Sequence, residues 1–268
     1  MPATSPGVFT QQFRRIPTLH TRHWALVIQG AVRHPLILDY QDVTAYPADD
    51  ISAAIICAHQ PAAHMPDSPL VYDAHFHGVA LARILADVHI APAVTGAALH
   101  AADGYTATLT LDQLRSAYLV LAMNGAPLPP EHGFPARIVI PGLYGFKMPK
   151  WIERIYLSAA PQPGTWESRG WNQDQIQPLV TLQTPLRDSV LNVGEPAALY
   201  GFGYGLNAAP HVMIDEIAIP VRNRVSDAGA LMYWEAAWRP TIPGDYRLRV
   251  QAAGQPSAAV VERVLHVR

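Results

Sequence analysis

The sequence is poor in cysteine and in charge. One cysteine in 268 residues excludes an internal disulfide framework and any metal site built on several cysteines. Charged residues make up 15% and hydrophobic residues 50%. An average soluble protein has about 25% charged residues, and an intrinsically disordered chain needs low hydrophobicity with high net charge. The composition therefore predicts a folded protein.

The sequence has no large excess of positive or negative charge, and it has no long apolar run. Nineteen basic and 21 acidic residues give a formal charge of −2, so there is no electrostatic reason to expect a nucleic-acid partner. No apolar run reaches the roughly 20 residues that span a bilayer, so we expect no membrane insertion. The opening segment MPATSPGVFTQQFRR has no apolar signal-peptide core. The cytoplasm is the expected location, or the periplasm if this start is a trimmed mature terminus.

The first part of the chain predicts a mixture of strands and helices. Residues 24–30 and 53–57 are apolar runs typical of strands. An apolar spacing of i, i+3, i+4, i+7 from Leu81 predicts a helix, and the capping-box spacing at Thr110 predicts the start of another. Residues 118–122 predict a strand that ends at a tight Asn-Gly turn.

The amino-acid composition changes between residues 159 and 177, where proline and polar residues predict a loop. Beyond it only short strands are predicted, as is typical of an immunoglobulin-like sandwich. We therefore expect an α+β fold, with a mixed domain over residues 1–168 and an all-β, immunoglobulin-like domain over residues 169–268. The strands expected in the second domain are 179–183, 197–202, 212–219, 231–236, 246–250 and 260–267.

Cys57 ends the predicted strand 53–57 and has two interpretations. A thiolate is a soft ligand that transition metals favour. A free cysteine is also among the most buried residue types, so composition alone favours a small core residue.

Cations gather around two turns later in this domain. Residues 129–137 hold His132 and Arg137 around a proline-rich turn, and residues 138–151 add two lysines after a glycine-containing loop. Converging cations and backbone N–H groups could bind an anionic ligand. The alternative is a pair of exposed lysines on a loop, and spacing alone leaves both open.

Several histidines follow Cys57 in the sequence. His75-Phe76-His77 places two imidazoles on one face of an extended segment. Together with His59 and His64 they could form an added metal site, but the intervening loops fix no ligand geometry, so polar histidines at a substrate funnel or the surface are favoured.

These features occur in the order seen in the sulfite oxidase family of molybdopterin enzymes, which the chain resembles over nearly its whole length. The similarity lies in Cys57, the Met123–Pro129 segment MNGAPLP, the His132–Arg137 segment HGFPAR, the Lys150-Trp151 pair and the Trp166–Trp171 segment WESRGW. The strand pattern from Val180 to Val267 is similar to the dimerisation domain of that family.

The resemblance implies a molybdenum–molybdopterin cofactor and roles for individual residues. Cys57 would be the thiolate ligand of molybdenum. His132, Arg137 and Lys150 would hold the pterin and its phosphate, and Asp103 falls in a loop near the metal. It also implies a sulfite-oxidase-type molybdopterin-binding domain over residues 1–168, a separate electron carrier such as a cytochrome, and a possible homodimer.

Two departures from the family concern the substrate side. Gln11, Gln12 and Phe13 align with the Arg-Asn-His of the family, and His59 and its neighbours replace the segment after the metal cysteine. Because an unpaired dianion in a desolvated site is costly, we expect a small substrate other than sulfite. Gln11 and His59 are candidate substrate-side catalytic residues, and Gln12 is a candidate cofactor contact.

The predicted function is a molybdopterin-dependent oxidoreductase that catalyses oxo transfer on a small molecule. Two alternatives remain: a binding or scaffold protein that has lost the cofactor, and a reductase of neutral S-oxides. Some of Met232, Tyr233, Trp234 and Trp238 are expected to be spare for a homodimer interface, because an alternating strand cannot bury all four in one core. In the alternative, Trp234 is the core tryptophan of the sandwich and Trp238 caps a loop, which would leave a monomer.

Overall fold

The computed structural model describes residues 10–58, 71–172, 174–186, 188–226, 231–253 and 260–268. The described residues form two compact units. Residues 10–58 and 74–176 form the larger unit, and residues 71–73 and 177–268 form the smaller one. None of the helices described is long and apolar enough to cross a membrane.

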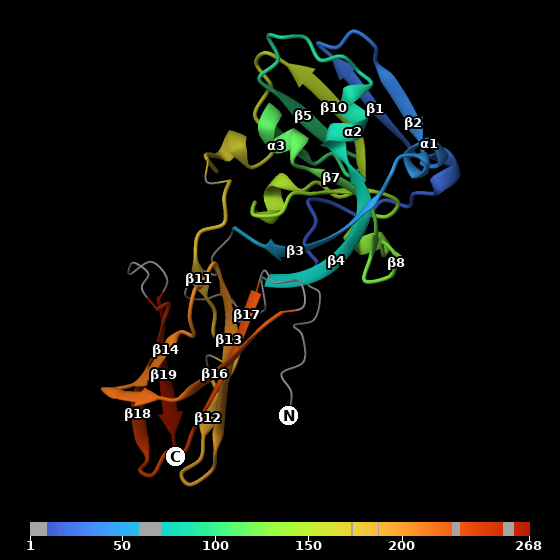
Figure 1. Cartoon of the computed structure of the whole chain (residues 1–268). Helices are drawn as coiled ribbons and strands as arrows, with labels where there is room; N and C mark the ends of the chain where they lie inside the picture. The colour runs from blue at the N-terminus through green and yellow to red at the C-terminus, as the bar shows by residue number, and fades with distance from the viewer. Residues whose placement is uncertain (1–9, 59–70, 173, 187, 227–230, 254–259) are drawn as a thin grey trace. The chain divides into compact units, whose positions relative to one another are not determined.

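The larger unit contains two sheets (Figure 1). In the first, β1 pairs in parallel with β10, and the other neighbours are antiparallel. The order of its strands is β2 (Leu36–Asp39), β1 (Ala25–Gly30), β10 (Ile152–Ser158), β5 (Gly96–Ala101) and β6 (Thr106–Thr110). The strand predicted at residues 24–30 is therefore confirmed as β1, and its parallel partner β10 lies more than a hundred residues later in the sequence.

The second sheet carries the ends of the strands that lead to the candidate site. Its order is β3 (Asp49–Ile56), β4 (Val71–Ala80), β7 (Tyr118–Met123) and β8 (Ala126–Pro127), and β9 (Arg137–Val139) also pairs with β7. Asn124 and Gly125 join β7 to β8 with φ values of 53° and 79°, so the predicted tight turn is confirmed.

The helices are short and their starts follow the sequence. α1 (Tyr40–Ala45) and α3 (Leu111–Arg115) begin with reciprocal capping boxes, the second at Thr110 as predicted. α2 (Leu81–Ala86) begins at the predicted residue and buries Leu81, Ile84 and Leu85. The described residues also contain the 3-10 turns η1 (Thr21–His23), η2 (Pro130–His132), η3 (Gly145–Lys147) and η4 (Glu167–Arg169).

The smaller unit is a pair of sheets around one core, built from residues of both sheets such as Leu199, Trp234 and Leu248. One sheet has the order β11 (Leu179–Val180), β13 (Ala197–Tyr204), β17 (Leu231–Trp238) and β16 (Val221–Val225). The other has β12 (Val190–Leu191), β19 (Val260–Val267), β18 (Gly244–Gln251), β14 (His211–Ile214) and β15 (Ile217–Ile219).

Two expectations for this unit are wrong. Residues 212–219 are not one strand but the hairpin of β14 and β15, which turns at Asp215 with a φ of 52°. Met232, Tyr233 and Trp234 are 8%, 4% and 1% exposed, so they are not spare for an interface. β17 lies between β13 and β16 and is buried on both faces at its start, which removes the alternation. Trp234 is the core tryptophan.

The described chain is therefore mostly β with few helices, none of the α-helices longer than six residues. The α+β class and the immunoglobulin-like type of the second unit remain predictions.

Candidate functional site

His132, Arg137 and Lys150 come together at the turn η2. Lys150 Nζ donates to the carbonyl of Glu131 at 2.7 Å, and Arg137 Nη1 donates to the carbonyl of His132 at 3.3 Å. Trp151 Nε1 donates to the carbonyl of Pro130 at 2.8 Å. The side chains of Lys150, Arg137 and Trp151 therefore bind three successive carbonyls of one turn. His132, Arg137 and Lys150 are called the cationic cradle below.

Gly133 permits this close packing. It caps η2 with a φ of 110°, a left-handed conformation that favours glycine. A β-carbon there would lie 2.9 Å from Arg137 Cβ and 3.1 Å from Lys150 Cβ. The glycine of the HGFPAR segment is thus required by the approach of the two cations.

Burial and mutual repulsion weaken the charged forms of the cradle side chains. His132 and Arg137 are buried, 5% and 3% exposed. Burial, Arg137 and Lys150 lower the pKa of His132 to about 4. Burial and Arg137 lower the pKa of Lys150 to about 7, although Asp103 and Glu131 act in the opposite direction. An anion bound here would favour the charged form of Lys150 and relieve the repulsion.

Cys57 lies directly after β3 and is half-buried, so it is not a core residue. Its thiol donates to Gln11 Oε1 at 3.3 Å, across 46 residues of sequence. The predicted metal ligand and the predicted substrate-side glutamine are therefore in contact. Gln12 is exposed, and His59 lies outside the described residues.

The turn between β5 and β6 brings Asp103 and Tyr105 to the same region. Asp103 is 8% exposed, and its carboxylate accepts the N–H of Tyr105 at 3.0 Å. Tyr105 donates its hydroxyl to the carbonyl of Phe146 in η3. Burial, followed by the charges of Glu167, Asp103 and Cys57, raises the pKa of Tyr105. Tyr105 was missed as a site residue, although it stands in the same AADGY segment as Asp103.

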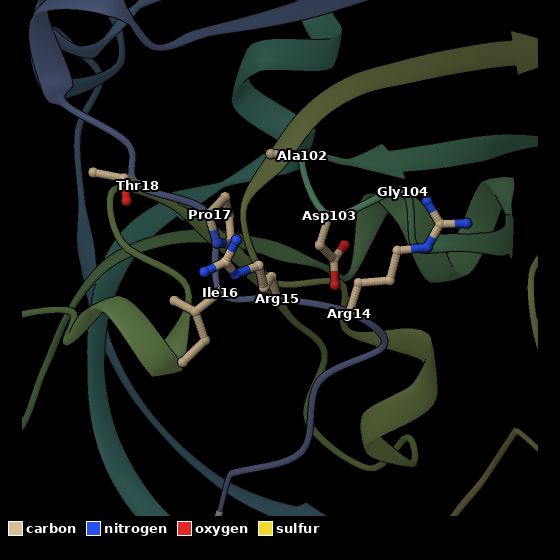
Figure 2. Close-up of a pocket in the computed structure, with 8 residues that line it drawn as sticks. All are labelled: Arg14, Arg15, Ile16, Pro17, Thr18, Ala102, Asp103 and Gly104. Carbon is tan, nitrogen blue, oxygen red and sulfur yellow. The ribbon is translucent and has the colours of Figure 1, made fainter.

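A pocket of about 690 Å³ opens beside this turn. Figure 2 shows Asp103 and Gly104 on one wall and the segment from Arg14 to Thr18 on the other. The two arginines of that segment extend in different directions, with the Asp103 carboxylate between them in the view. No motif in the sequence singled out this wall.

Lys147 has a role different from that of Lys150. Its side chain is 4% exposed, and Nζ lies 2.9 Å from Glu167 Oε1 and 3.2 Å from Asp174 Oδ1. It also donates to the carbonyl of Thr108. The interpretation of two lysines that clamp one anion is wrong, because Lys147 is neutralised by carboxylates of its own chain. The WESRGW segment supplies Glu167 to this ion pair.

The His75–Phe76–His77 segment has the predicted orientation on β4. Both histidines are exposed and Phe76 is buried. His75 Nδ1 lies 2.9 Å from Ser52 Oγ, and His77 Nδ1 lies 2.8 Å from Asp50 Oδ1. Among the residues that the structure describes, no group of three or more His, Cys, Asp or Glu side chains could hold a metal ion. His64 lies outside those residues.

The donor set fits a phosphorylated molybdopterin. Arginine and lysine are the side chains with which proteins bind phosphate, and the cradle places a buried arginine and a largely desolvated lysine beside one turn. Cys57 offers a half-buried thiol suited to a soft metal.

The chain is similar in sequence to a molybdopterin-binding family and to several known oxidoreductases. A family described as "Oxidoreductase molybdopterin binding domain" matches residues 13–166. The chain is 33% identical over 167 residues to the "Uncharacterized oxidoreductase YuiH" of Bacillus subtilis (strain 168), covering 58% of this chain and 80% of that protein. It is 24% identical over 190 residues to the mitochondrial sulfite oxidase of Mus musculus, covering 62% of this chain and 35% of that enzyme.

A solved structure shows the same fold. It is titled "Crystal Structure of the Sulfane Dehydrogenase SoxCD from Paracoccus pantotrophus" and matches with a TM-score of 0.77 at 20% identity. The match covers 91% of this chain and 70% of that one. This chain spans about a third of the sulfite oxidase and most of the YuiH protein.

Proposed function

The chain belongs to the molybdopterin-binding oxidoreductase family and is a molybdenum-cofactor oxidoreductase of the sulfite oxidase type, and from this premise we propose that it catalyses oxo transfer on a small substrate other than sulfite. The observation that carries the proposal is the cationic cradle in the same unit as Cys57. The molybdenum centre would supply the two-electron redox chemistry, and the protein would position it.

The residues of the cradle would hold the pterin end of the cofactor. Arg137 offers a planar, permanently charged donor to a phosphate. Lys150, with a pKa of about 7, would take up a proton as an anion binds beside it. His132, with a pKa of about 4, is neutral at pH 7 and would donate or accept a hydrogen bond without adding charge. Asp103 and Gln12 are further candidate cofactor contacts.

Cys57, Gln11 and Tyr105 would act on the metal and substrate side. Cys57 would ligate molybdenum as thiolate. The amide of Gln11, 3.3 Å from Cys57 in this structure, would orient the substrate by neutral hydrogen bonds. Tyr105 would keep its proton at physiological pH, because its pKa is raised, and so would be a hydrogen-bonding group rather than a base. His59 remains a candidate for proton delivery.

The position of Gln11 supports a substrate other than sulfite. A neutral amide, where the family has an arginine, cannot neutralise a dianion next to the thiol. Electrons would pass to a separate carrier such as a cytochrome. The smaller unit would be the immunoglobulin-like domain of the family, and two chains would pair as a homodimer.

The test is metal content together with activity. Protein from a molybdate-supplied host should contain about one molybdenum per chain by mass spectrometry, and oxidation should release a fluorescent pterin. Cys57→Ser should have the same unfolding midpoint as the wild type but lose oxo-transfer activity, because a hydroxyl is a poorer ligand for a soft metal. His77→Gln, exposed on β4, serves as the control. A metal-free wild type would favour the scaffold alternative, and full activity of Cys57→Ser would make Cys57 structural.

A further inference from the structure

The pocket beside Asp103 has a wall that the proposed function leaves unused. Arg14 and Arg15 line it together with Asp103 and Gly104 (Figure 2). Among the described residues, no carboxylate forms an ion pair with either arginine. Two positively charged side chains therefore line the pocket without a carboxylate partner among the described residues.

Arg14 contacts an aromatic ring and the turn that carries Asp103. Its guanidinium carbon lies 5.3 Å from the centre of the Phe13 ring. That ring meets Tyr105 edge to face at 6.0 Å between centroids. A β-carbon on Gly104 would lie 3.4 Å from Arg14 Nη1, so the arginine lies over the turn that carries Asp103. Gln11, three residues earlier, contacts Cys57. One short segment thus joins the thiol to the pocket.

The size and charge of the pocket define what it can bind. A volume of 690 Å³ lies within the range of about 300–1,000 Å³ typical of small-molecule sites and far exceeds an inorganic oxoanion. The carboxylate of Asp103, 8% exposed, repels a ligand with several negative charges. One negative charge placed against the arginines, on a larger organic molecule, satisfies both constraints.

We propose that Arg14 and Arg15 bind a carboxylate, or a similar singly charged group, of an organic substrate whose uncharged reacting group is directed toward Cys57. This rests on the proposed function and adds the substrate class to it. The arginines would select the substrate by a charge remote from the reacting atom, while Gln11 contacts the neutral end.

The test compares two probes that differ only in charge, 3-(methylsulfinyl)propanoate and its amide. Binding to the molybdenum-loaded protein is measured by titration calorimetry at pH 7.5 in 50 mM salt. The carboxylate should bind roughly tenfold more tightly than the amide, and 500 mM salt should reduce this preference because exposed charges are screened. In the Arg14→Gln/Arg15→Gln variant the two probes should bind within about twofold of each other. Arg33→Gln, an exposed arginine outside the pocket, is the matched control and should keep the preference.

The outcomes separate this inference from the function on which it rests. Equal binding of the two probes by the wild type, or a preference that survives removal of both arginines, overturns the inference even when molybdenum is present. Loss of the preference in Arg33→Gln as well would show a general charge effect and also overturn it. A wild type without molybdenum defeats the proposed function, whereas the calorimetric preference and its loss in the double variant would still establish the anion site.

Discussion

Replacing Lys147 by methionine should destabilise the protein more than a surface change would. Lys147 is 4% exposed in its side chain and bridges Glu167 and Asp174, which are 13% and 26% exposed. Methionine keeps the length of the side chain but removes the charge. The variant would leave the Glu167 carboxylate buried without its cation.

The expected loss follows from these burial values. Removing one partner of a buried ion pair typically costs about 3–5 kcal/mol. The lower end applies here, because Asp174 is partly solvated and Glu167 Oε1 keeps the N–H of Thr108 at 2.9 Å. A loss of about 3 kcal/mol corresponds to a fall in Tm of roughly 6–12 °C for a unit of this size.

Urea unfolding followed by tryptophan fluorescence provides the assay. Trp166 and Trp171 stack at 4.6 Å beside Glu167 and report on this region. The double variant Lys147→Met/Glu167→Gln should recover at least half of the lost stability, because the glutamine amide carries no charge and can donate to the Thr108 carbonyl that Lys147 vacates. A loss below about 1 kcal/mol in the single variant, or no recovery in the double variant, would refute a buried ion pair at this position.

Three further predictions concern the cradle and the assembly. In cofactor-free protein the unfolding free energy should rise with pH between about 7 and 10. The reason is that Lys150 has a pKa of about 7 in the fold and 10.5 ordinarily, so over this range it is protonated only in the unfolded chain. Urea midpoints at pH 7 and pH 9 should show this rise in the wild type and a smaller rise in Lys150→Met. Gly133→Ala should lose molybdenum and about 1–3 kcal/mol of stability. The control is Gly125→Ala, which is also at positive φ but has open space around its β-carbon and should keep its metal. Equal metal contents in the two variants would contradict the packing argument. We expect a homodimer, so light scattering at micromolar concentration should give twice the 29.2 kDa of one chain. A mass near 29.2 kDa would exclude the homodimer.

The sequence alone was sufficient wherever a local pattern decides the structure. The hydroxyl of Thr110 and the amide of Gln113 cap α3 because their spacing places each beside the other's backbone. Asn124 and Gly125 turn the chain because both tolerate positive φ. The order of Cys57, the HGFPAR segment and Lys150-Trp151 also predicted the family correctly.

Where alternation fails, contacts on the second face of a strand are the reason. β17 is buried at four consecutive residues because Trp234 lies in the core, while Tyr233 on the other face packs edge to face against Phe202 and donates its hydroxyl to Asp73. No feature of residues 231–234 indicates these contacts. The hairpin at Asp215 is similar. The apolar residues on both sides continue a strand pattern, and only the pairing of β14 with β15 shows that the chain reverses.

The site itself was decided by contacts between distant segments. Lys147 and Lys150 are the same residue type three positions apart. Lys147 forms ion pairs with Glu167 and Asp174, whereas Lys150 donates a hydrogen bond to the turn η2. The thiol of Cys57 meets Gln11 across 46 residues. Composition and spacing indicate which chemical groups the chain possesses, but the pKa and the partner of each group depend on burial and on neighbouring charge, which only the folded chain brings together.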